Sequence, residues 1–529
     1  THKFIGIYAT NRIEWVLTYL GAAQQSVTIV PLYDTLGADA VQFCVNQSEL
    51  TIVACDNNKR AKMLLDCAKS MPTLRTIVLM DVDSEGKDVV KDLLIANPQI
   101  TLQSWADFEK TGATKPDTKM QPATKKDLYI VCYTSGTTGN PKGVMLTHAN
   151  ILSCPHAFLL RASHVEPLGP GKISISYLPL AHIFEQVVHM CVLYRGGAIG
   201  FYRGNTLKLL DDVKVRCRSV LMFHQNVQAL KPHLFPIVPR LLSRLYDKVQ
   251  SNVSKSNALA QWLYHTAYAN KLSKLKRGVI TRNTIWDSLI FKKIQAEIGG
   301  NVEVMITGAA PISGEVLEMC RVTLGCAIIE GYGQTECSAA CSVTMIGDAT
   351  TGHVGPPIPC NTIKLMDVPD MQYYARDNKG EVCIRGANVM VGYYKEPEKT
   401  AEALDADGWL HTGDVGMWLP NGTLKIIDRK KHIFKLAQGE YVAPEKIENV
   451  YVRLNLIGQI FVDGDSHQRY LVAIVVPDEH ECRAYLRKAD ARAADATFEQ
   501  MCTNQSLVQH ILDEMNKFAA QNKLNSIEK

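Results

Sequence analysis

The chain of 529 residues has no apolar run long enough to cross a membrane, and no signal peptide opens it. It also lacks internal repeats and low-complexity tracts. Its excess of positive charge is small, because 57 Lys and Arg against 53 Asp and Glu leave a net charge of +4. A repeat array is therefore excluded, and so small an excess gives no case for a nucleic-acid partner.

Cysteine is abundant, but the pairing pattern of a secreted or zinc-binding protein is missing. There are 15 cysteines, and one close pair, Cys337 and Cys341, has no second pair at zinc-site spacing. Others, such as Cys132 and Cys383, stand in apolar, strand-like runs where a thiol packs as a small hydrophobe. The pattern predicts a reduced, cytosol-facing protein.

The densest basic stretch runs from Lys271 to Arg282. An anionic membrane surface is one partner that this stretch would suit. A solvated helix face is the interpretation that we favour from the sequence.

The length predicts two or more domains, because one hydrophobic core rarely serves so many residues. A hydrophobic content of 46% and a charged content of 21% are typical of a soluble globular enzyme. Over residues 1–110, apolar strand-like runs alternate with helical patterns, which predicts a parallel sheet flanked by helices. The expected strands are Phe4–Tyr8, Val27–Pro31, Thr51–Cys55 and Thr76–Met80, and the expected helices are Trp15–Gln24, Ala38–Gln47 and Lys59–Lys69.

The second half of the chain predicts a change of architecture. From Gly299 to Ile433, short strands and Gly/Pro turns dominate, and the charged stretch from Ile426 to Lys435 is typical of a hinge. A helix is expected in Val442–Val450, with strands at Gln459–Val462 and Leu471–Val476. We therefore expect an α/β protein with a large multi-layer domain (residues 1–427), a hinge (428–431) and a small, incomplete α+β domain (432–529).

One loop has the composition of a polyphosphate site. In Tyr133–Gly143, glycines and small hydroxyl residues leave backbone N–H groups uncovered, so that several can face phosphate oxygens. Its candidate ligands are Thr134, Ser135, Gly136, Thr137, Thr138, Gly139 and Lys142. Apolar, strand-like runs flank it on both sides, and Gly143 follows Lys142, so a Walker loop does not fit.

Four further clusters offer groups that suit a nucleotide. In Gly331–Glu336, Tyr332 offers a flat ring to a purine, Thr335 a hydroxyl to a phosphate, and Glu336 a hard oxygen ligand to Mg²⁺. The others are the small-residue turn Thr307–Pro311, the run Trp409–Asp414 whose Asp414 suits ribose hydroxyls, and Asp428–His432, which contains Arg429. Each cluster alone is more often structural, and their joint occurrence carries the prediction.

These clusters, with Tyr177–Glu185, resemble the motifs of the adenylate-forming superfamily. Within this superfamily, the sequences of Lys435–Glu448 and Val30–Gly37 are similar to those of eukaryotic long-chain acyl-CoA synthetases. The resemblance extends through nearly the whole chain.

The resemblance implies a reaction in two steps, with ATP, Mg²⁺, coenzyme A and a long-chain fatty acid as reactants and cofactors. The fatty acid carboxylate attacks the α-phosphate of ATP, and coenzyme A then displaces AMP from the acyl-adenylate. By this resemblance, Thr134–Lys142 would hold the β- and γ-phosphates and Glu336 the Mg²⁺. The other implied roles are adenine contact for Gly308, Ala309 and Tyr332, nucleotide binding for Gly331, Gly333 and Thr335, ribose contact for Asp414 and Arg429, carboxylate contact for His182, a hinge at Lys431, and the thioester step for Lys435.

Two departures from the resemblance carry expectations of their own. Relatives continue past Lys529 and carry there a lysine used in adenylation, so we expect the chain as given to adenylate poorly. Residues 215–228 form an insertion, which is either a functional loop near the acyl tunnel or, as we favour, a retained intron or gene-model error. A membrane anchor before Thr1 would place the longer protein on the endoplasmic reticulum or the mitochondrial outer membrane, facing the cytosol.

Three alternatives remain open on the sequence. A related ligase would load an aromatic or amino acid onto coenzyme A or a carrier protein. An ATP-binding pseudoenzyme would bind the nucleotide without releasing pyrophosphate. A scaffolding protein would leave the nucleotide-type clusters without an explanation.

Overall fold

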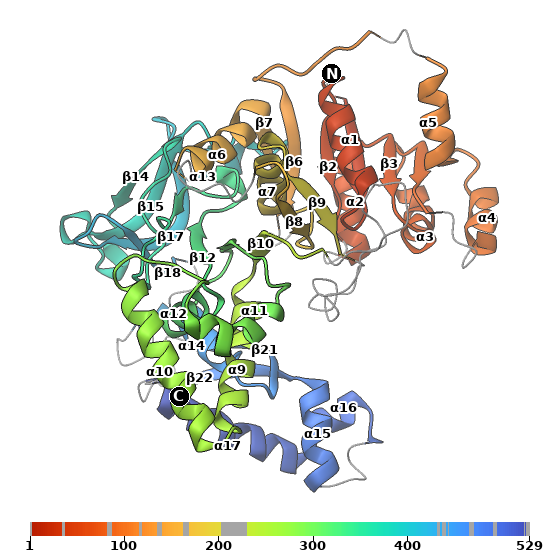
Figure 1. Cartoon of the computed structure of the whole chain (residues 1–529). Helices are drawn as coiled ribbons and strands as arrows, with labels where there is room; N and C mark the ends of the chain where they lie inside the picture. Colours follow the sequence, from red (N-terminus) through yellow and green to blue (C-terminus); the bar gives the residue numbers. More distant parts are fainter. Residues whose placement is uncertain are drawn as a thin grey trace.

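The structure, a computed structural model, describes residues 3–33, 37–81, 87–115, 119–134, 140–161, 169–202, 230–430, 434–435, 441–442, 444–464, 470–489, 495–522 and 524. Within these residues, two large sheets and their helices build the main body, and a smaller lobe follows it along the chain (Figure 1). The insertion 215–228, residues 135–139 and Lys431 lie outside the described residues.

The first sheet contains the strands that the N-terminal alternation predicts. Its strand order is β16 (Gly392–Tyr393), β7 (Lys142–Thr147), β6 (Leu128–Thr134), β2 (Thr28–Pro31), β1 (Phe4–Tyr8), β3 (Ile52–Cys55), β4 (Thr76–Leu79), β5 (Thr101–Ser104). Strands β6, β2, β1, β3, β4 and β5 run parallel to one another, whereas β7 and β16 are antiparallel to their neighbours. The expected parallel sheet is confirmed, with strand ends that differ by no more than one residue from those expected.

The second sheet carries the edge from which the candidate site is built. Its order is β13 (Ser342–Val343), β12 (Ala327–Tyr332), β11 (Val304–Thr307), β10 (Leu234–Ile237), β8 (Ile173–Ser176), β9 (Ala198–Phe201). All but β13 run parallel, so the carboxyl ends of β11 and β12 lie next to each other.

Helices separate and cover these two sheets. The helices α1 (Ile13–Ala23), α6 (His148–Arg161) and α7 (Ile183–Tyr194) share one buried core with strands of both sheets, so they form the middle layer. The first sheet is covered on its outer face by α2 (Gly37–Gln47) and α3 (Asn58–Asp66), with α4 (Lys87–Ala96) and α5 (Trp105–Ala113) nearby. The second is covered by α9 (Pro239–Ser254), α10 (Ala258–Leu275), α11 (Lys292–Ala296) and α12 (Gly314–Leu324).

The helix α12 was not predicted from the sequence. Eight of its 11 residues are buried, including Arg321, so its sequence lacks the polar outer face that makes a surface helix recognisable. The expectation that strands and turns dominate from Gly299 onward was therefore incomplete.

An antiparallel sheet connects the main body to the C-terminal lobe. Its order is β14 (Asn361–Met366), β15 (Lys379–Gly386), β17 (Leu410–Trp418), β18 (Leu424–Arg429), and α13 (Pro397–Ala403) precedes β17. Asp428 and Arg429 belong to β18, and a hinge at Lys431 stays a prediction.

The C-terminal lobe has cores of its own (Figure 1). It contains the hairpins β19 (Phe434–Lys435) with β20 (Tyr441–Val442) and β21 (Ile457–Gly464) with β22 (Leu471–Pro477), together with α14 (Pro444–Tyr451), α15 (Glu479–Ala489), α16 (Phe498–Cys502) and α17 (Gln505–Gln521). The Arg240 guanidinium of α9 donates to the backbone carbonyl of Gly458 at 2.8 Å, which links the lobe to the main body. None of the helices in the described part is long and apolar enough to span a membrane.

Candidate active site

The candidate phosphate loop joins two paired strands, as the sequence predicts. Strand β6 ends at Thr134 and β7 begins at Lys142, and these two residues stand opposite each other in an antiparallel pair. A Walker loop would lead from a strand into a helix instead. The candidate ligands Ser135, Gly136, Thr137, Thr138 and Gly139 themselves lie outside the described residues.

Tyr393 brings two of the predicted residues together. The Lys142 Nζ lies 5.2 Å from the centre of its ring, and the Tyr393 hydroxyl donates a hydrogen bond of 2.8 Å to Glu336 Oε1. Strand β16 positions Tyr393, because it pairs with β7 beside Lys142. Burial and the adjacent Glu336 carboxylate raise the pKa of Tyr393, so its hydroxyl stays a donor.

Sequence reasoning missed Tyr393. The available signal was the pair Gly392–Tyr393 directly after the apolar run 389–391, but nothing local indicates that its hydroxyl would reach Glu336. The contact joins segments that are far apart in the chain, and only the sheet brings them together.

A second group of predicted residues meets at the edge of the antiparallel sheet. The Tyr332 hydroxyl donates to Asp414 Oδ2 at 2.6 Å, and Arg429 Nε lies 3.5 Å from Asp414 Oδ1. Asp414 and Arg429 face each other across β17 and β18. Burial raises the pKa of Asp414, and the nearby Glu336 raises it further, while Tyr332 and Arg429 lower it. The two groups therefore share one electrostatic environment.

The backbones of two predicted glycines approach closely between these groups. A Cβ atom on Gly308 would lie 2.8 Å from the carbonyl oxygen of Gly331, so a larger residue would push β11 and β12 apart at this point. The next residue, Ala309, has a positive φ of 67°. This glycine ridge, formed by Gly308 and Gly331, carries no bulky side chain next to Tyr332.

His182 lies at the start of α7. Its Nδ1 accepts a hydrogen bond from the Phe184 N–H at 3.4 Å, so Nε2 carries the proton of the neutral ring. Protein surrounds the ring on most sides, which lowers the pKa of His182, although its edge meets solvent in the cavity described below. At neutral pH the ring is uncharged and offers one N–H donor.

Asn11 holds the segment that leads to His182, and sequence reasoning missed it. Its Oδ1 accepts from the Leu180 N–H at 2.8 Å, and its Nδ2 donates to the Leu178 carbonyl at 2.6 Å. Asn11 is buried, so these bonds satisfy groups that would otherwise be costly. No motif marks it in the sequence.

A partly enclosed cavity of about 80 Å³ adjoins the glycine ridge. His182, Gly308, Gly331, Gly333 and Gln334 line its polar end, and Cys154, Phe158, Val187, Val188, Cys191, Val343 and Ile358 are among the residues of its apolar wall. The wall comes chiefly from the helices α6 and α7 of the middle layer. Such a cavity suits an apolar molecule that carries a polar group at one end.

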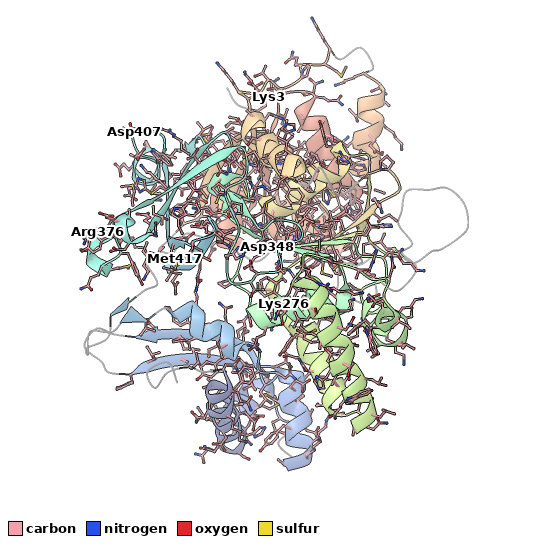
Figure 2. All side chains as sticks on the ribbon, turned by 60° about the vertical axis from the view of Figure 1, so that its left-hand side comes forward. Lys3, Lys276, Asp348, Arg376, Asp407 and Met417 are labelled. Atoms are coloured by element: carbon pink, nitrogen blue, oxygen red, sulfur yellow. The ribbon has the colours of Figure 1, made fainter. Side chains whose placement is uncertain are left out.

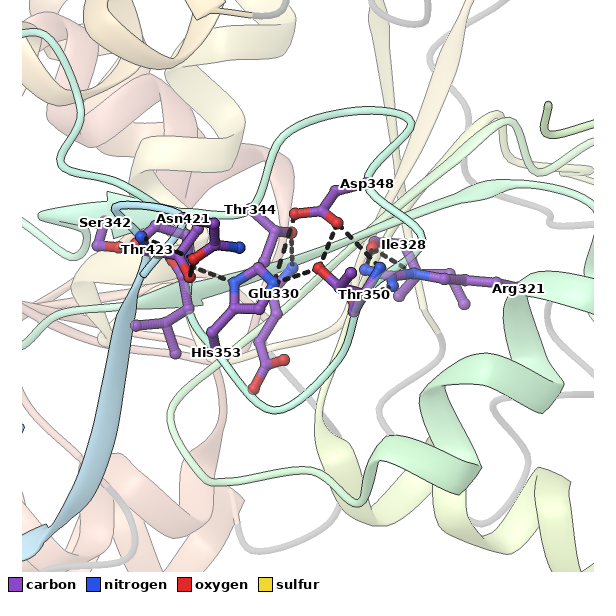
Figure 3. Close-up of polar contacts among 12 residues, drawn as sticks. Arg321, Ile328, Glu330, Ser342, Thr344, Asp348, Thr350, His353, Asn421 and Thr423 are labelled. Carbon is purple, nitrogen blue, oxygen red and sulfur yellow. Dashed lines mark hydrogen bonds and ion pairs between the residues drawn. The ribbon is translucent and has the colours of Figure 1, made fainter. Parts of the chain in front are cut away.

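A largely buried polar network contacts β12 (Figure 3). Arg321 donates to the carbonyls of Ile328 and Thr350, each at 2.9 Å, and the Glu330 N–H donates to Thr344 Oγ1 at 2.9 Å. Farther along the loop, the Gly355 N–H donates to His353 Nδ1 at 3.1 Å. The network fixes the strand that carries Tyr332.

Glu330 is a buried member of this network whose carboxyl group is only partly satisfied. Burial raises the pKa of its carboxyl to about 7, and Arg321 lowers it only in part. Its Oε2 has no hydrogen-bond partner among the described residues.

The remaining predicted residues have different outcomes. Thr335 is buried at the start of a 3₁₀ turn, Thr335–Cys337, one residue before Glu336. Lys435 lies in β19 opposite Tyr441, and its side chain is outside the described part, as is the whole of Lys431. Their roles stay predictions.

The residues present fit a magnesium ion that arrives with phosphates. No group of three His, Cys, Asp or Glu side chains within the described ranges could hold a metal ion by itself. Mg²⁺ in nucleotide sites is commonly bound by one or two carboxylates together with phosphate oxygens. Glu336, beside Lys142 and the end of the candidate phosphate loop, matches that donor set.

Comparisons with known proteins show the family of the chain. The family model described as "AMP-binding enzyme" matches residues 1–394. Human long-chain-fatty-acid–CoA ligase 1 is 47% identical over 99% of this chain and 72% of its own length, and rat long-chain-fatty-acid–CoA ligase 5 is 47% identical over 99% and 74%. A peroxisomal long chain acyl-CoA synthetase 6 of Arabidopsis thaliana is 40% identical over 99% and 71%.

Solved structures support the fold. The A domain of a carboxylic acid reductase from Segniliparus rugosus, in complex with AMP and a co-purified carboxylic acid, superposes with a TM-score of 0.75. It is 22% identical, and the match covers 100% of this chain and 76% of that one. This likeness shows the fold, and the fold together with the family match defines an AMP-binding enzyme with a mixed α/β main body.

The chain belongs to the AMP-binding enzymes and, within them, to the long-chain-fatty-acid–CoA ligases.

Proposed function

We propose that this protein activates long-chain fatty acids with ATP and transfers them to coenzyme A. In the first step, a carboxylate oxygen of the fatty acid bonds to the α-phosphorus of ATP, and the bond to the β-phosphate breaks, which releases pyrophosphate. In the second step, the sulfur of coenzyme A bonds to the acyl carbon, and AMP leaves. Family membership at 47% identity over nearly the whole chain supports this proposal.

One observation carries the proposal: the apolar cavity and the nucleotide-type residues meet at the same glycine ridge. Gly308 and Gly331 line the polar end of the cavity, and Tyr332, which follows Gly331, donates a hydrogen bond to Asp414, which does not line the cavity. A carboxylate at the polar end would therefore lie next to a nucleotide bound over Tyr332. Bringing two reactants together in this way is a large part of the rate gain in such reactions.

We assign the nucleotide contacts according to this arrangement. Thr134 and Lys142, at the two ends of the phosphate loop, face the β- and γ-phosphates together with the residues between them. Tyr332, Gly308 and Ala309 contact the adenine, and Asp414 with Arg429 contacts the ribose hydroxyls. Gly331, Gly333 and Thr335 keep the backbone close to the nucleotide.

Glu336 would hold the Mg²⁺, which masks phosphate charge when it is bound. Tyr393 orients the Glu336 carboxylate through its hydrogen bond of 2.8 Å. Lys142 stays near both groups because its ammonium rests over the Tyr393 ring. Lys431 as the hinge and Lys435 in the thioester step complete the proposal.

His182 is the residue that we assign to the substrate carboxylate. Its Nε2 carries the proton, and the ring borders the polar end of the cavity. A neutral N–H donor can orient a carboxylate without forming an ion pair that would weaken its nucleophilicity. The apolar wall formed by α6 and α7 receives the acyl chain.

A substrate panel tests the proposal directly. Release of AMP that depends on coenzyme A is measured with a long-chain fatty acid, an aromatic acid and an amino acid. We expect the release to be greatest with the long-chain acid, whatever its absolute rate, and to fall by about 10²-fold or more in H182A. Release with only the aromatic or amino acid would assign a different carboxylate. ATP binding without any release would indicate a pseudoenzyme.

We also propose a reducing, cytosol-facing location. The 14 cysteines in the described part are all free, and most are buried as small hydrophobes. A disulfide that is present in protein isolated from cells without reductant, and whose loss by cysteine substitution destabilises the protein in cells, would contradict this location.

A further inference from the structure

A group of exposed apolar and basic side chains lies on α10 and on the helical segment that follows it. Within the described residues, nine large apolar side chains are more than 60% exposed, and four of them lie between residues 259 and 289. They are Leu259, Trp262, Ile285 and Leu289. Scattered exposed apolar residues need no explanation, but a group of this kind marks an interaction surface.

The same segment concentrates the positive charge of the chain. Residues 255–293 contain eight Lys and Arg and one acidic residue, Asp287, so their net charge is +7, against +4 for the whole chain. The buried pair of Lys271 Nζ and Asp287 Oδ1, at 2.5 Å, accounts for one basic residue. None of the exposed ones forms an ion pair within the described part of the chain, and these are Lys255, Lys276, Arg277, Lys292 and Lys293.

On α10, the apolar and basic side chains share one face. Tyr264, Ala267, Lys271 and Leu275 form its buried face. At 100° per residue, Leu259 and Trp262 lie on the opposite face, and Lys276 and Arg277 continue that face at the end of the helix. Figure 2 shows Lys276 near one end of this helix, on the outside of the molecule.

The neighbouring helical segment, residues 285–296, repeats the arrangement. Its exposed positions include Ile285, Leu289, Lys292 and Lys293, at the spacing of one helix face. This segment packs beside α10 through the Lys271–Asp287 pair, and both pack onto α12. Both helical segments therefore carry exposed apolar and basic side chains on faces that do not pack onto α12.

We propose that this surface, which we call the α10 face, docks on an anionic lipid bilayer. Basic residues interleaved with Trp and aliphatic side chains are the composition of surfaces that lie at the membrane interface, where the rings and aliphatic groups enter the headgroup region and the cations meet anionic lipids. A solvated helix face explains the charges near the end of α10, which also suit the helix dipole. It does not explain the exposed Leu259, Trp262, Ile285 and Leu289.

The inference does not depend on the proposed reaction. Nucleic acid is the other polyanion to consider, and it would use the basic residues without the aliphatic ones. The two partners therefore differ in what removal of Trp262 should do.

Vesicle flotation of the chain tests the α10 face. We expect the protein to float with phosphatidylcholine vesicles that contain phosphatidylserine and to stay in solution with phosphatidylcholine alone. Added salt should release it, because the charges are screened. The double variant K276A/R277A should lower the partition coefficient by at least tenfold, since each basic residue near an anionic surface contributes about 1 kcal/mol, or roughly fivefold.

A matched control separates location from net charge. K125A/K126A removes the same charge from an exposed pair elsewhere on the protein and should leave binding within about twofold of wild type. W262A should weaken vesicle binding. The fluorescence of Trp262, obtained as the difference between the emission spectra of wild type and W262F, should shift to the blue when vesicles are added. The Tm of each variant is measured alongside, and only variants that keep it are compared.

Three outcomes would overturn the proposal. The first is equal binding of wild type to anionic and neutral vesicles. The second is a loss of binding in K125A/K126A as large as that in K276A/R277A. The third is tighter binding to a nucleic-acid duplex than to the vesicles, through Lys276 and Arg277 but without any effect of W262A. Turnover with detergent-solubilised fatty acid should stay unchanged in all these variants, so failure here leaves the proposed function untouched.

Discussion

At the scale of single residues, the candidate site depends on groups that act through other groups. Tyr393 has no assigned contact with ATP or with the fatty acid, yet it contacts both Lys142 and Glu336. Asp414 likewise depends on Tyr332 and Arg429 for its position. The effects of these positioning contacts can be separated by conservative substitutions.

Y393F removes one hydroxyl and keeps the ring. We expect it to weaken MgATP binding by roughly tenfold, because a hydrogen bond to a charged group contributes about 1.5–3 kcal/mol. Binding without Mg²⁺ should change much less, since Lys142 can still rest over the ring. Calorimetric titration with a non-hydrolysable ATP analogue, with and without Mg²⁺, measures both.

Y394F is the matched control for that change. Tyr394 neighbours Tyr393 and contacts Phe4 through its ring, but its hydroxyl has no hydrogen bond within the described part of the chain. Equal losses in Y393F and Y394F, or a loss in Y393F that is the same with and without Mg²⁺, would contradict the role of Tyr393.

Glu330 links burial to a pH dependence of stability. Its pKa rises from an ordinary value of 4.5 to about 7 in the folded protein. Below both pKa values the carboxyl is neutral in the folded and in the unfolded state. Above both it is charged in each state, and because the charge is buried in the folded protein, the free energy of unfolding is lower there. This group therefore lowers the stability of the wild type as the pH rises from about 4.5 to about 7.

E330Q should remove that loss. We expect its Tm to exceed that of wild type by a few degrees at pH 8 and to approach the wild-type value near pH 4.5. Thermal unfolding at both pH values measures the difference. A shift of the same size and sign at both would show that charge on Glu330 is not its cause.

At the scale of elements, strand ends and helix starts position the site. The carboxyl ends of β11 and β12 supply Gly308 and Tyr332, the start of α7 supplies His182, and β17 with β18 supplies Asp414. The contacts between these elements are therefore as important as the side chains.

G308A tests the approach of β11 to β12. The added Cβ would lie 2.8 Å from the Gly331 carbonyl oxygen, so one backbone segment must move. We expect nucleotide affinity to fall by tenfold or more, while the secondary structure seen by circular dichroism is kept. Equilibrium binding of the ATP analogue measures the effect.

G112A serves as the control for G308A. Gly112 lies in the exposed helix α5 with no atom within 4 Å of an added Cβ, so alanine there should stabilise the helix by about 0.5–1 kcal/mol. Unchanged nucleotide affinity in G308A would show that the close approach of Gly308 to Gly331 is not needed for nucleotide binding.

V187F tests the cavity wall that α7 provides. A phenyl group in place of the Val187 side chain should fill part of the cavity. We expect kcat/KM for a long-chain acid to fall more than tenfold relative to a medium-chain acid, with ATP affinity unchanged. A competition assay between the two acids measures the ratio, and an unchanged ratio would place the acyl chain elsewhere.

The elements with regular patterns were predictable from the sequence. Strands Phe4–Tyr8 and Thr76–Leu79 follow apolar runs between turn signals, and they were placed to within one residue. The helix α12 was missed because it is buried on most sides and has no polar face. Periodicity indicates only those helices that divide their surface between core and solvent.

At the scale of the whole molecule, the candidate site could be predicted in part. The motifs around Lys142, Tyr332 and Asp414 have compositions that suit a nucleotide. The structure brings Tyr332 to Asp414, and it brings Lys142 to Tyr393, whose hydroxyl bonds to Glu336. Asn11 and Tyr393 could not be found, because their importance arises from contacts with distant segments. Local sequence motifs therefore indicate which chemical groups a site offers, but they do not indicate which distant segments hold those groups in place.

The layered architecture explains why the site forms where it does. The middle helices serve both sheets, so the apolar cavity lies among them while the polar residues gather at the strand ends. An acid held in the cavity and a nucleotide held at the edge would meet at Gly308 and Gly331. That meeting point is the central claim of the account.

The most direct test of this claim is the binding of a stable analogue of the acyl-adenylate, in which a sulfamate links a long acyl chain to adenosine. Calorimetry should show it binding at least 10²-fold more tightly than adenosine or the fatty acid alone, because it fills both sites at once. D414N and V187F should each weaken it. Affinity no greater than that of adenosine, unchanged in both variants, would show that the cavity and the nucleotide site do not meet.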